Sequence, residues 1–242
     1  MPADIDVYAE GLSIESDQIK ISSGELTAKI FFNSFAMDRW KGVLVIPRME
    51  AYRYEVQNMS VKLSGSIHNL SFNDLNADVY KGKVSGRLNV DWIKDVHYRT
   101  DIKFEGVDIS ALKEVDASVY GQIEGIIQGS VVIGGSAHNF DTLGLKAQIT
   151  KDGRMNASLL KFVLPYMPRT EGSTNVFGLM KQGLKVPVEV ANIEIHSVDE
   201  HKISGTVKLG VGQLNLDLNL PVDILYDGNL FSLIEWYKKL GK

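Results

Sequence analysis

The alternation of apolar and polar positions predicts a chain built mainly from β-strands. The clearest segment is 213–225, in which every second residue is apolar and the residues between them are Asn, Asp or Pro. Successive side chains of a strand point to opposite faces, so this segment has one apolar and one polar face. Pro221 has no N–H to donate to a neighbouring strand, which predicts that this strand lies at a sheet edge.

Similar alternation recurs along the rest of the chain and predicts roughly a dozen strands in all. The connections between them are short, which favours an antiparallel meander. Turn signals lie at Lys81-Gly82, Gly134-Gly135, Asp152-Gly153 and Asp227-Gly228. Gly121, Gly125 and Gly129 recur every four residues on one face of a predicted strand, where they would let the strand curve.

Two short α-helices are expected to interrupt the sheet. The first spans about 156–164, with Asn156 as its N-cap and Pro165 just beyond its end. The second spans about 230–240, where Ser232 and Glu235 have the spacing of a capping box.

An internal repeat relates the segments 61–81 and 131–151, which align without a gap. A duplicated strand–turn–strand unit would explain the match, and such units bury their apolar faces only against neighbouring units. The alternative is chance similarity between meanders that share turn chemistry. The identical pairs are Val61/Val131, Gly65/Gly135, Ser66/Ser136, His68/His138, Asn69/Asn139, Leu75/Leu145, Ala77/Ala147 and Lys81/Lys151.

Composition narrows the possible functions. A net charge of −4 offers no basic surface for nucleic acid. The chain has no cysteine, which excludes disulfides and cysteine-ligated metals. The five histidines show no compact ligand spacing, and no nucleophile elbow, phosphate-binding loop or dinucleotide fingerprint is present. We therefore predict no catalytic residues, no metal and no cofactor, and a protein that is not an enzyme.

Several runs resemble the C-terminal region of AsmA-like proteins, which belong with TamB and YdbH in a bacterial envelope superfamily. They are ADVYKGKVSGRLNVDW (77–92), YRTDIKFEGVDISAL (98–112), GQIEGIIQGSVVIGGSAHNFDTLGLKAQITKDGRM (121–155) and NASLLKFVLPY (156–166). The family habits in these runs are a strand ending in a Gly-rich turn, a "GVDIS-L" segment, a "G-I-G-V-I-G" strand pair, and a "DGRM" turn leading into a helix. It covers roughly residues 77–166, with weaker support as far as 224.

The resemblance implies a periplasmic protein, anchored in the inner membrane of a bacterium by an N-terminal helix that this chain does not contain. The implied fold is an elongated, curved, mostly antiparallel sheet with an apolar groove. The implied function is phospholipid transport between the inner and outer membranes, as part of cell-envelope and outer-membrane biogenesis. We expect residues 1–242 to form a single repeat-built module, a fragment of a longer membrane-anchored protein, beginning mid-protein behind an added Met.

An apolar sheet face can be satisfied in two ways, and alternation does not decide between them. The face can pack against a second sheet in a dry sandwich, or it can curl into a groove that holds a phospholipid or another acyl-chain lipid. The repeat and the resemblance favour the groove; the alternative is a structural or interaction module with an envelope protein partner. The expected groove residues are Leu88, Val90, Phe104, Ile127, Val131, Ile133, Val207, Leu209, Leu214, Leu216, Leu218 and Leu220.

Overall fold

The computed structural model describes most of the chain. The described residues are 3–16, 19–33, 36–51, 54–114, 122–136, 139–162, 178, 180, 182–199, 201–211 and 216–225. No helix among them is long and apolar enough to cross a bilayer.

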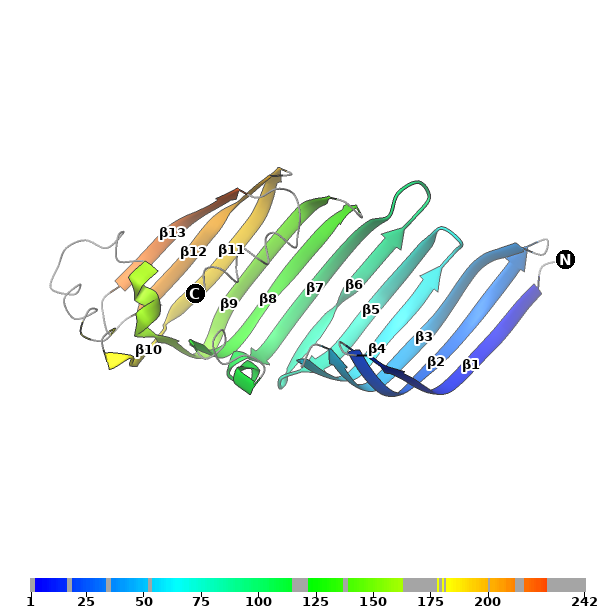
Figure 1. The fold of residues 1–242 in the computed structure, drawn as a ribbon, viewed down its shortest axis with the longest axis horizontal. Helices are drawn as coiled ribbons and strands as arrows, with labels where there is room; N and C mark the ends of the chain where they lie inside the picture. Colours follow the sequence, from blue (N-terminus) through cyan, green and yellow to red (C-terminus); the bar gives the residue numbers. More distant parts are fainter. Residues whose placement is uncertain are drawn as a thin grey trace.

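The described residues form one antiparallel sheet of 13 strands, ordered almost entirely as they follow in the chain (Figure 1). The order is β1-β2-β3-β4-β5-β6-β7-β8-β9-β11-β12-β13, and the short β10 also pairs with β9. The prediction of a mainly antiparallel β protein is confirmed. The strands are β1 (Ala3–Glu15), β2 (Ile19–Asn33), β3 (Ala36–Ala51), β4 (Tyr54–Gly65), β5 (Asn69–Val79), β6 (Gly82–Asp91), β7 (His97–Asp108), β8 (Ile123–Ser136), β9 (Phe140–Asn156), β10 (Lys185–Pro187), β11 (Val190–Asp199), β12 (Lys202–Val211) and β13 (Leu216–Leu225).

The last strand behaves as its sequence pattern predicts. In β13 the apolar positions pair with apolar positions of β12, for example Leu220 with Val207. Pro221 lies opposite Thr206 in β13, which is the final strand of the sheet order in the described chain. The missing N–H of proline is tolerated there because an edge strand has only one neighbour to satisfy.

The turn predictions were less accurate than the strand predictions. The β5–β6 hairpin turns at Tyr80 and Lys81, one residue before the predicted pair, and Val79 pairs with Gly82 to close it. Gly134-Gly135 lies inside β8, where the two residues pair with Arg99 and Tyr98 of β7, so this turn prediction is wrong.

The Asp152-Gly153 turn prediction is also wrong, since both residues lie inside β9. They form a bulge, because between the pairs Glu124–Arg154 and Ile126–Lys151 the two residues of β9 lie opposite one residue of β8. Gly125 lies within this bulge with a φ of 133°. The Asp227-Gly228 signal lies outside the described residues.

The predicted α-helix at 156–164 is instead a 3-10 helix, η2 (Ala157–Phe162). Asn156 does cap it, since its Oδ1 accepts a hydrogen bond from Ser158 N at 2.9 Å. The segment is held between two strands, because Ala157 N–H donates to Leu184 O at 2.9 Å just before β10. A second 3-10 helix, η1 (Ile109–Glu114), was not expected. The helix predicted at 230–240 lies outside the described residues.

The main packed core lies where η2 and β10 cover one face of the sheet near β9 and β12. The buried residues of this core are Met155, Ala157, Leu160, Val186, Val188 and Val211, and Leu209 and Leu220 pack against it from the sheet. Elsewhere the apolar side chains of the sheet are mostly half-buried, as expected of a single layer.

Candidate functional site

One face of the sheet is apolar along its whole length. Residues that pair across strands lie on the same face, so the register can be followed from strand to strand. Starting at β13, paired positions run Leu220, Val207, Ile193, Ala147, Gly129, Phe104, Val84 and Ala77, which reaches β5.

The same face continues to the first strand. Leu88 of β6 pairs with Phe72 of β5, and from there the paired positions are Leu63, Gly42, Ala28 and Val7. Every residue in this series is apolar or glycine. The structure therefore brings the alternating positions of twelve strands onto one continuous surface, which we call the apolar face.

The predicted groove residues belong to this face wherever the structure describes them. Leu88 and Val90 lie in β6, Phe104 in β7, Ile127, Val131 and Ile133 in β8, Val207 and Leu209 in β12, and Leu216, Leu218 and Leu220 in β13, all at positions joined by the register above. Leu214 lies outside the described residues. The structure thus gathers positions from five strands onto one surface.

The prediction missed the contribution of β1–β5 to this face. Leu44 and Leu63, for example, belong to it through the pairs Leu44–Val61 and Gly42–Leu63. The signal in β3 was weak because Val43 and Val45, on the opposite face, are also apolar. With neighbouring positions both apolar, the period of two disappears from that stretch.

The apolar face is open over most of its extent. Among the described residues no second sheet packs against it, so they do not form the two-sheet sandwich considered above. Cover comes from η2 and β10 over β9 and β12. The side chains of Leu88, Val131 and Val207 are half-buried by their neighbours in the sheet and remain partly accessible.

The opposite face is mostly polar, with scattered exposed valines such as Val43 and Val190, and carries cross-strand ion pairs. Arg87 Nε lies 2.8 Å from Asp101 Oδ2, and Lys62 Nζ lies 2.7 Å from Asp74 Oδ2. The hydrogen bond from Lys146 lowers the pKa of the Glu194 carboxyl below its ordinary value.

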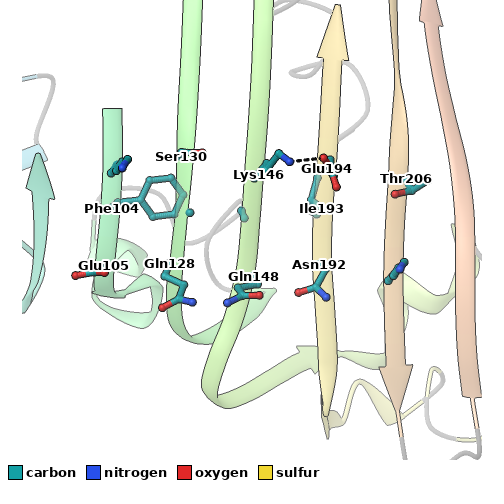
Figure 2. A pocket seen from close by; sticks show the side chains of 14 residues that line it. Phe104, Glu105, Gln128, Ser130, Lys146, Gln148, Asn192, Ile193, Glu194 and Thr206 are labelled. Carbon is teal, nitrogen blue, oxygen red and sulfur yellow. Dashed lines mark ion pairs between the residues drawn. The ribbon is translucent and has the colours of Figure 1, made fainter. Parts of the chain in front are cut away.

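A shallow depression of about 470 Å³ also lies on this polar face. Figure 2 shows its lining, with Lys146 directed toward Glu194 and with Gln128, Gln148 and Asn192 side by side on β8, β9 and β11. These charged and amide side chains can all form hydrogen bonds with water. Among the described residues, no group of three or more His, Cys, Asp or Glu side chains is arranged to hold a metal ion.

The repeated segments share a backbone hydrogen bond at the connection between their two strands. In the first, Ser66 N–H donates to Asn69 O at 3.0 Å between β4 and β5. In the second, Ser136 N–H donates to Asn139 O at 2.7 Å between β8 and β9. The matched residues therefore occupy equivalent positions in two hairpins, which accounts for Ser and Asn in the repeat as turn formers.

No protein-family model, no curated protein and no solved structure matches this chain. The resemblance to AsmA-like proteins therefore stays a prediction from the sequence motifs.

Proposed function

We propose that the apolar face binds the acyl chains of a phospholipid or another acyl-chain lipid, in a periplasmic AsmA-like protein that takes part in phospholipid transport between the inner and outer membranes. The observation that carries the proposal is the continuity of this face from β1 to β13 without a second sheet over the described residues. The localisation, the inner-membrane anchor and the transport role rest on the sequence resemblance.

The energetics favour a ligand on such a face. Apolar surface left in water costs about 25 cal/mol per Å², so an open sheet face gains free energy when a hydrocarbon chain covers it. Twelve strands at about 4.8 Å spacing give a surface roughly 50 Å long, which is longer than a single acyl chain. Several lipids, or one lipid at several positions, could therefore be accommodated by the same contacts.

The placement of charge is compatible with a lipid whose headgroup stays outside the apolar face. The ion pairs Arg87–Asp101 and Lys62–Asp74 lie on the polar face, so the apolar face carries none of these charges. Burying an unpaired charge on an apolar surface costs several kcal/mol, so the headgroup of a bound lipid would stay in water at the margin of the sheet. Curling of the apolar face into a groove is part of this proposal.

Lipid carriage can be tested on the purified chain by native mass spectrometry and by lipid extraction. Phospholipid that co-purifies with the folded chain is the expected result. Leu88→Asp places a carboxylate on the open part of the apolar face, between Phe72 and Thr100. We expect this variant to stay folded, because water can reach the new carboxylate, and to lose bound lipid.

The matched control is the neighbouring change Asn89→Asp. Asn89 is exposed on the polar face and pairs with Arg99 of β7, so a new carboxylate there meets a cation. Asn89→Asp should keep both its fold and its lipid. A parent chain with no bound lipid after purification and after incubation with phospholipid vesicles would overturn the proposal.

The second candidate is an interaction module in envelope assembly that offers an edge strand to a partner protein. It is favoured by β1, which pairs only with β2 in the described chain and contains no proline over its 13 residues. Such an edge can accept an added strand through backbone hydrogen bonds. Proline at Val7, in the middle of β1, would then abolish capture of the envelope partner without releasing bound lipid.

A further inference from the structure

Four large hydrophobic side chains are exposed in two connections at the same end of the strands. They are Ile67 (55% exposed) in the β4–β5 turn, and Trp92 (40%), Ile93 (69%) and Val96 (42%) in the β6–β7 connection. Figure 1 shows both connections at the same edge, where the β6–β7 connection projects beyond its neighbours. We call these four residues the hairpin tip. Contiguous exposed apolar groups of this kind mark contact surfaces.

Two hydrogen bonds fix the tip in one arrangement. Trp92 N–H donates to His68 O at 2.9 Å, and the indole Nε1–H of Trp92 donates to Ile67 O at 2.8 Å. The only polar atom of the indole is thus satisfied inside the protein, and the part of the ring that remains exposed is hydrocarbon. The tip is therefore a preordered apolar surface, which lowers the entropic cost of binding.

The size of the tip suits a bilayer better than a protein partner. With ~200 Å² for a large apolar side chain, the exposed fractions amount to about 400 Å². A stable protein interface buries about 800 Å² on each partner, which is about twice that area. Binding to the interfacial layer of a bilayer instead scales with the apolar area that is buried, so a small projecting surface can contribute to it.

We propose that the hairpin tip inserts Trp92, Ile93 and their neighbours into the interfacial layer of a lipid bilayer. The charges around the tip balance, with Asp91 and Asp95 against Lys94 and Arg99. Binding is therefore driven by apolar area and depends little on ionic strength or on anionic lipid.

The tip also adjoins the apolar face. Val90, two residues before Trp92, lies on that face and pairs with Leu70 and Tyr98. An acyl chain leaving a bilayer held by the tip would meet the apolar face at these residues. This route rests on the proposed lipid-binding function, whereas insertion of the tip does not.

The experiment uses the full chain with Trp40→Phe and Trp236→Phe, which leaves Trp92 as the one tryptophan, excited selectively above the tyrosine absorption. Uncharged phosphatidylcholine vesicles, with and without lipids brominated near the headgroup, are the probe. We expect the emission of Trp92 to shift to shorter wavelength and to be quenched by the brominated lipids, equally at low and high salt. Ile93→Asp should weaken vesicle binding roughly tenfold, because the most exposed apolar group becomes charged.

Val190→Asp is the matched control, since Val190 is 42% exposed but lies at the start of β11 on the polar face. It should bind vesicles like the parent chain. Unchanged Trp92 emission at saturating vesicle concentration, or equal binding by Ile93→Asp and the parent, would overturn the proposal. Self-association that Ile93→Asp abolishes, without vesicle binding by the parent, would also overturn it.

Lipid binding by the apolar face and bilayer insertion of the hairpin tip can be tested independently. Ile93→Asp leaves the apolar face intact, so it should still co-purify with lipid while losing vesicle binding. Leu88→Asp should lose the co-purifying lipid but still bind vesicles. Thermal unfolding of each variant shows whether the fold is kept.

Discussion

The ring of Phe104 on β7 lies over Gly129 on β8. Its Cζ atom is 2.7 Å from the position that a Cβ would take at the glycine, and the two residues are paired across the strands. The carbonyl oxygen of Lys146 on β9 is closer still, at 2.0 Å from that position. The apolar face thus depends on glycine here for close approach of the chain and for room for the aromatic ring.

Gly129→Ala should therefore destabilise the protein. The new methyl group meets a backbone oxygen of β9, which can move only if the strands separate, so we expect a loss of about 1–3 kcal/mol in the free energy of unfolding. Gly144→Ala on β9 is the control, because the nearest atom to its Cβ position is Val132 Cβ at 3.6 Å. In urea denaturation, the free energy of unfolding of Gly144→Ala should equal or slightly exceed that of the parent. Equal effects of the two changes would contradict the geometry.

Asp108 ends β7 and caps η1. Its Oδ1 accepts a hydrogen bond from Ser110 N at 3.0 Å, and its Oδ2 lies 2.9 Å from Lys81 Nζ. Asp108→Asn should cost under about 1 kcal/mol at neutral pH, because asparagine caps nearly as well and Lys81 is largely exposed. Asp108→Ala should cost about 1 kcal/mol more, because it also removes the cap.

The same carboxylate predicts a pH dependence. The hydrogen bond from Lys81, which outweighs burial, lowers the pKa of Asp108 below its ordinary value. Its stabilising effect is complete above the unfolded-state pKa of about 3.9 and is lost as the pH falls through the lower folded-state pKa. The stability difference between the parent and Asp108→Asn should therefore shrink as the pH falls through this window in denaturation experiments. A constant difference would show that the charge of Asp108 contributes nothing.

The β5–β6 turn offers a stabilising change. Tyr80 and Lys81 both have positive φ angles, 46° and 67°, which non-glycine residues adopt at a cost of about 1 kcal/mol or more. Lys81→Gly relieves this strain but removes the exposed pair with Asp108, which is worth about 0.2–1 kcal/mol. We expect a small net gain in melting temperature. Lys81→Ala, which removes the pair without relieving the strain, should lower it.

The alternation of the sequence predicted which residues share a face better than it predicted turns. Leu216, Leu218 and Leu220 lie as expected because each alternates with a polar residue, and a shift of one residue would expose the entire set. Gly134-Gly135 resembled a turn because glycine is common in turns, yet these residues pair within β8. Glycine also allows close approach between strands, and the sequence does not distinguish the two uses.

The number of layers could not be read from alternation, because it depends on contacts between distant parts of the chain. A sandwich and a single sheet have the same pattern within each strand. The α-helix predicted around Leu159 and Leu160 was wrong in type. The segment is a 3-10 helix, held between β9 and β10. The hairpin tip was missed because Ile67 and Trp92 are 25 residues apart and meet only through the register of β5 and β6.

The cover over the end of the apolar face depends on Leu160. This side chain in η2 is fully buried and clusters with Val186 and Val211, so η2 and β10 are held on the sheet by apolar contacts. Leu160→Ala should lower the free energy of unfolding by about 2–5 kcal/mol, because the side chain is fully buried. Leu159→Ala should cost less, since Leu159 is only partly buried at the edge of the same cluster.

Hydrogen exchange can localise the effect of Leu160→Ala. We expect faster exchange in η2 and β10 and at Ala157 N–H, which donates to Leu184 O in the parent. Exchange in β4–β7 should hardly change, because none of the hydrophobic residues in or packed against the cluster around Leu160 belongs to those strands. If the cover is removed without unfolding of the sheet, more of the apolar face around Leu209 and Leu220 becomes accessible, and bound lipid should increase. Uniformly faster exchange across all the strands would instead show that the cover and the sheet unfold as one unit.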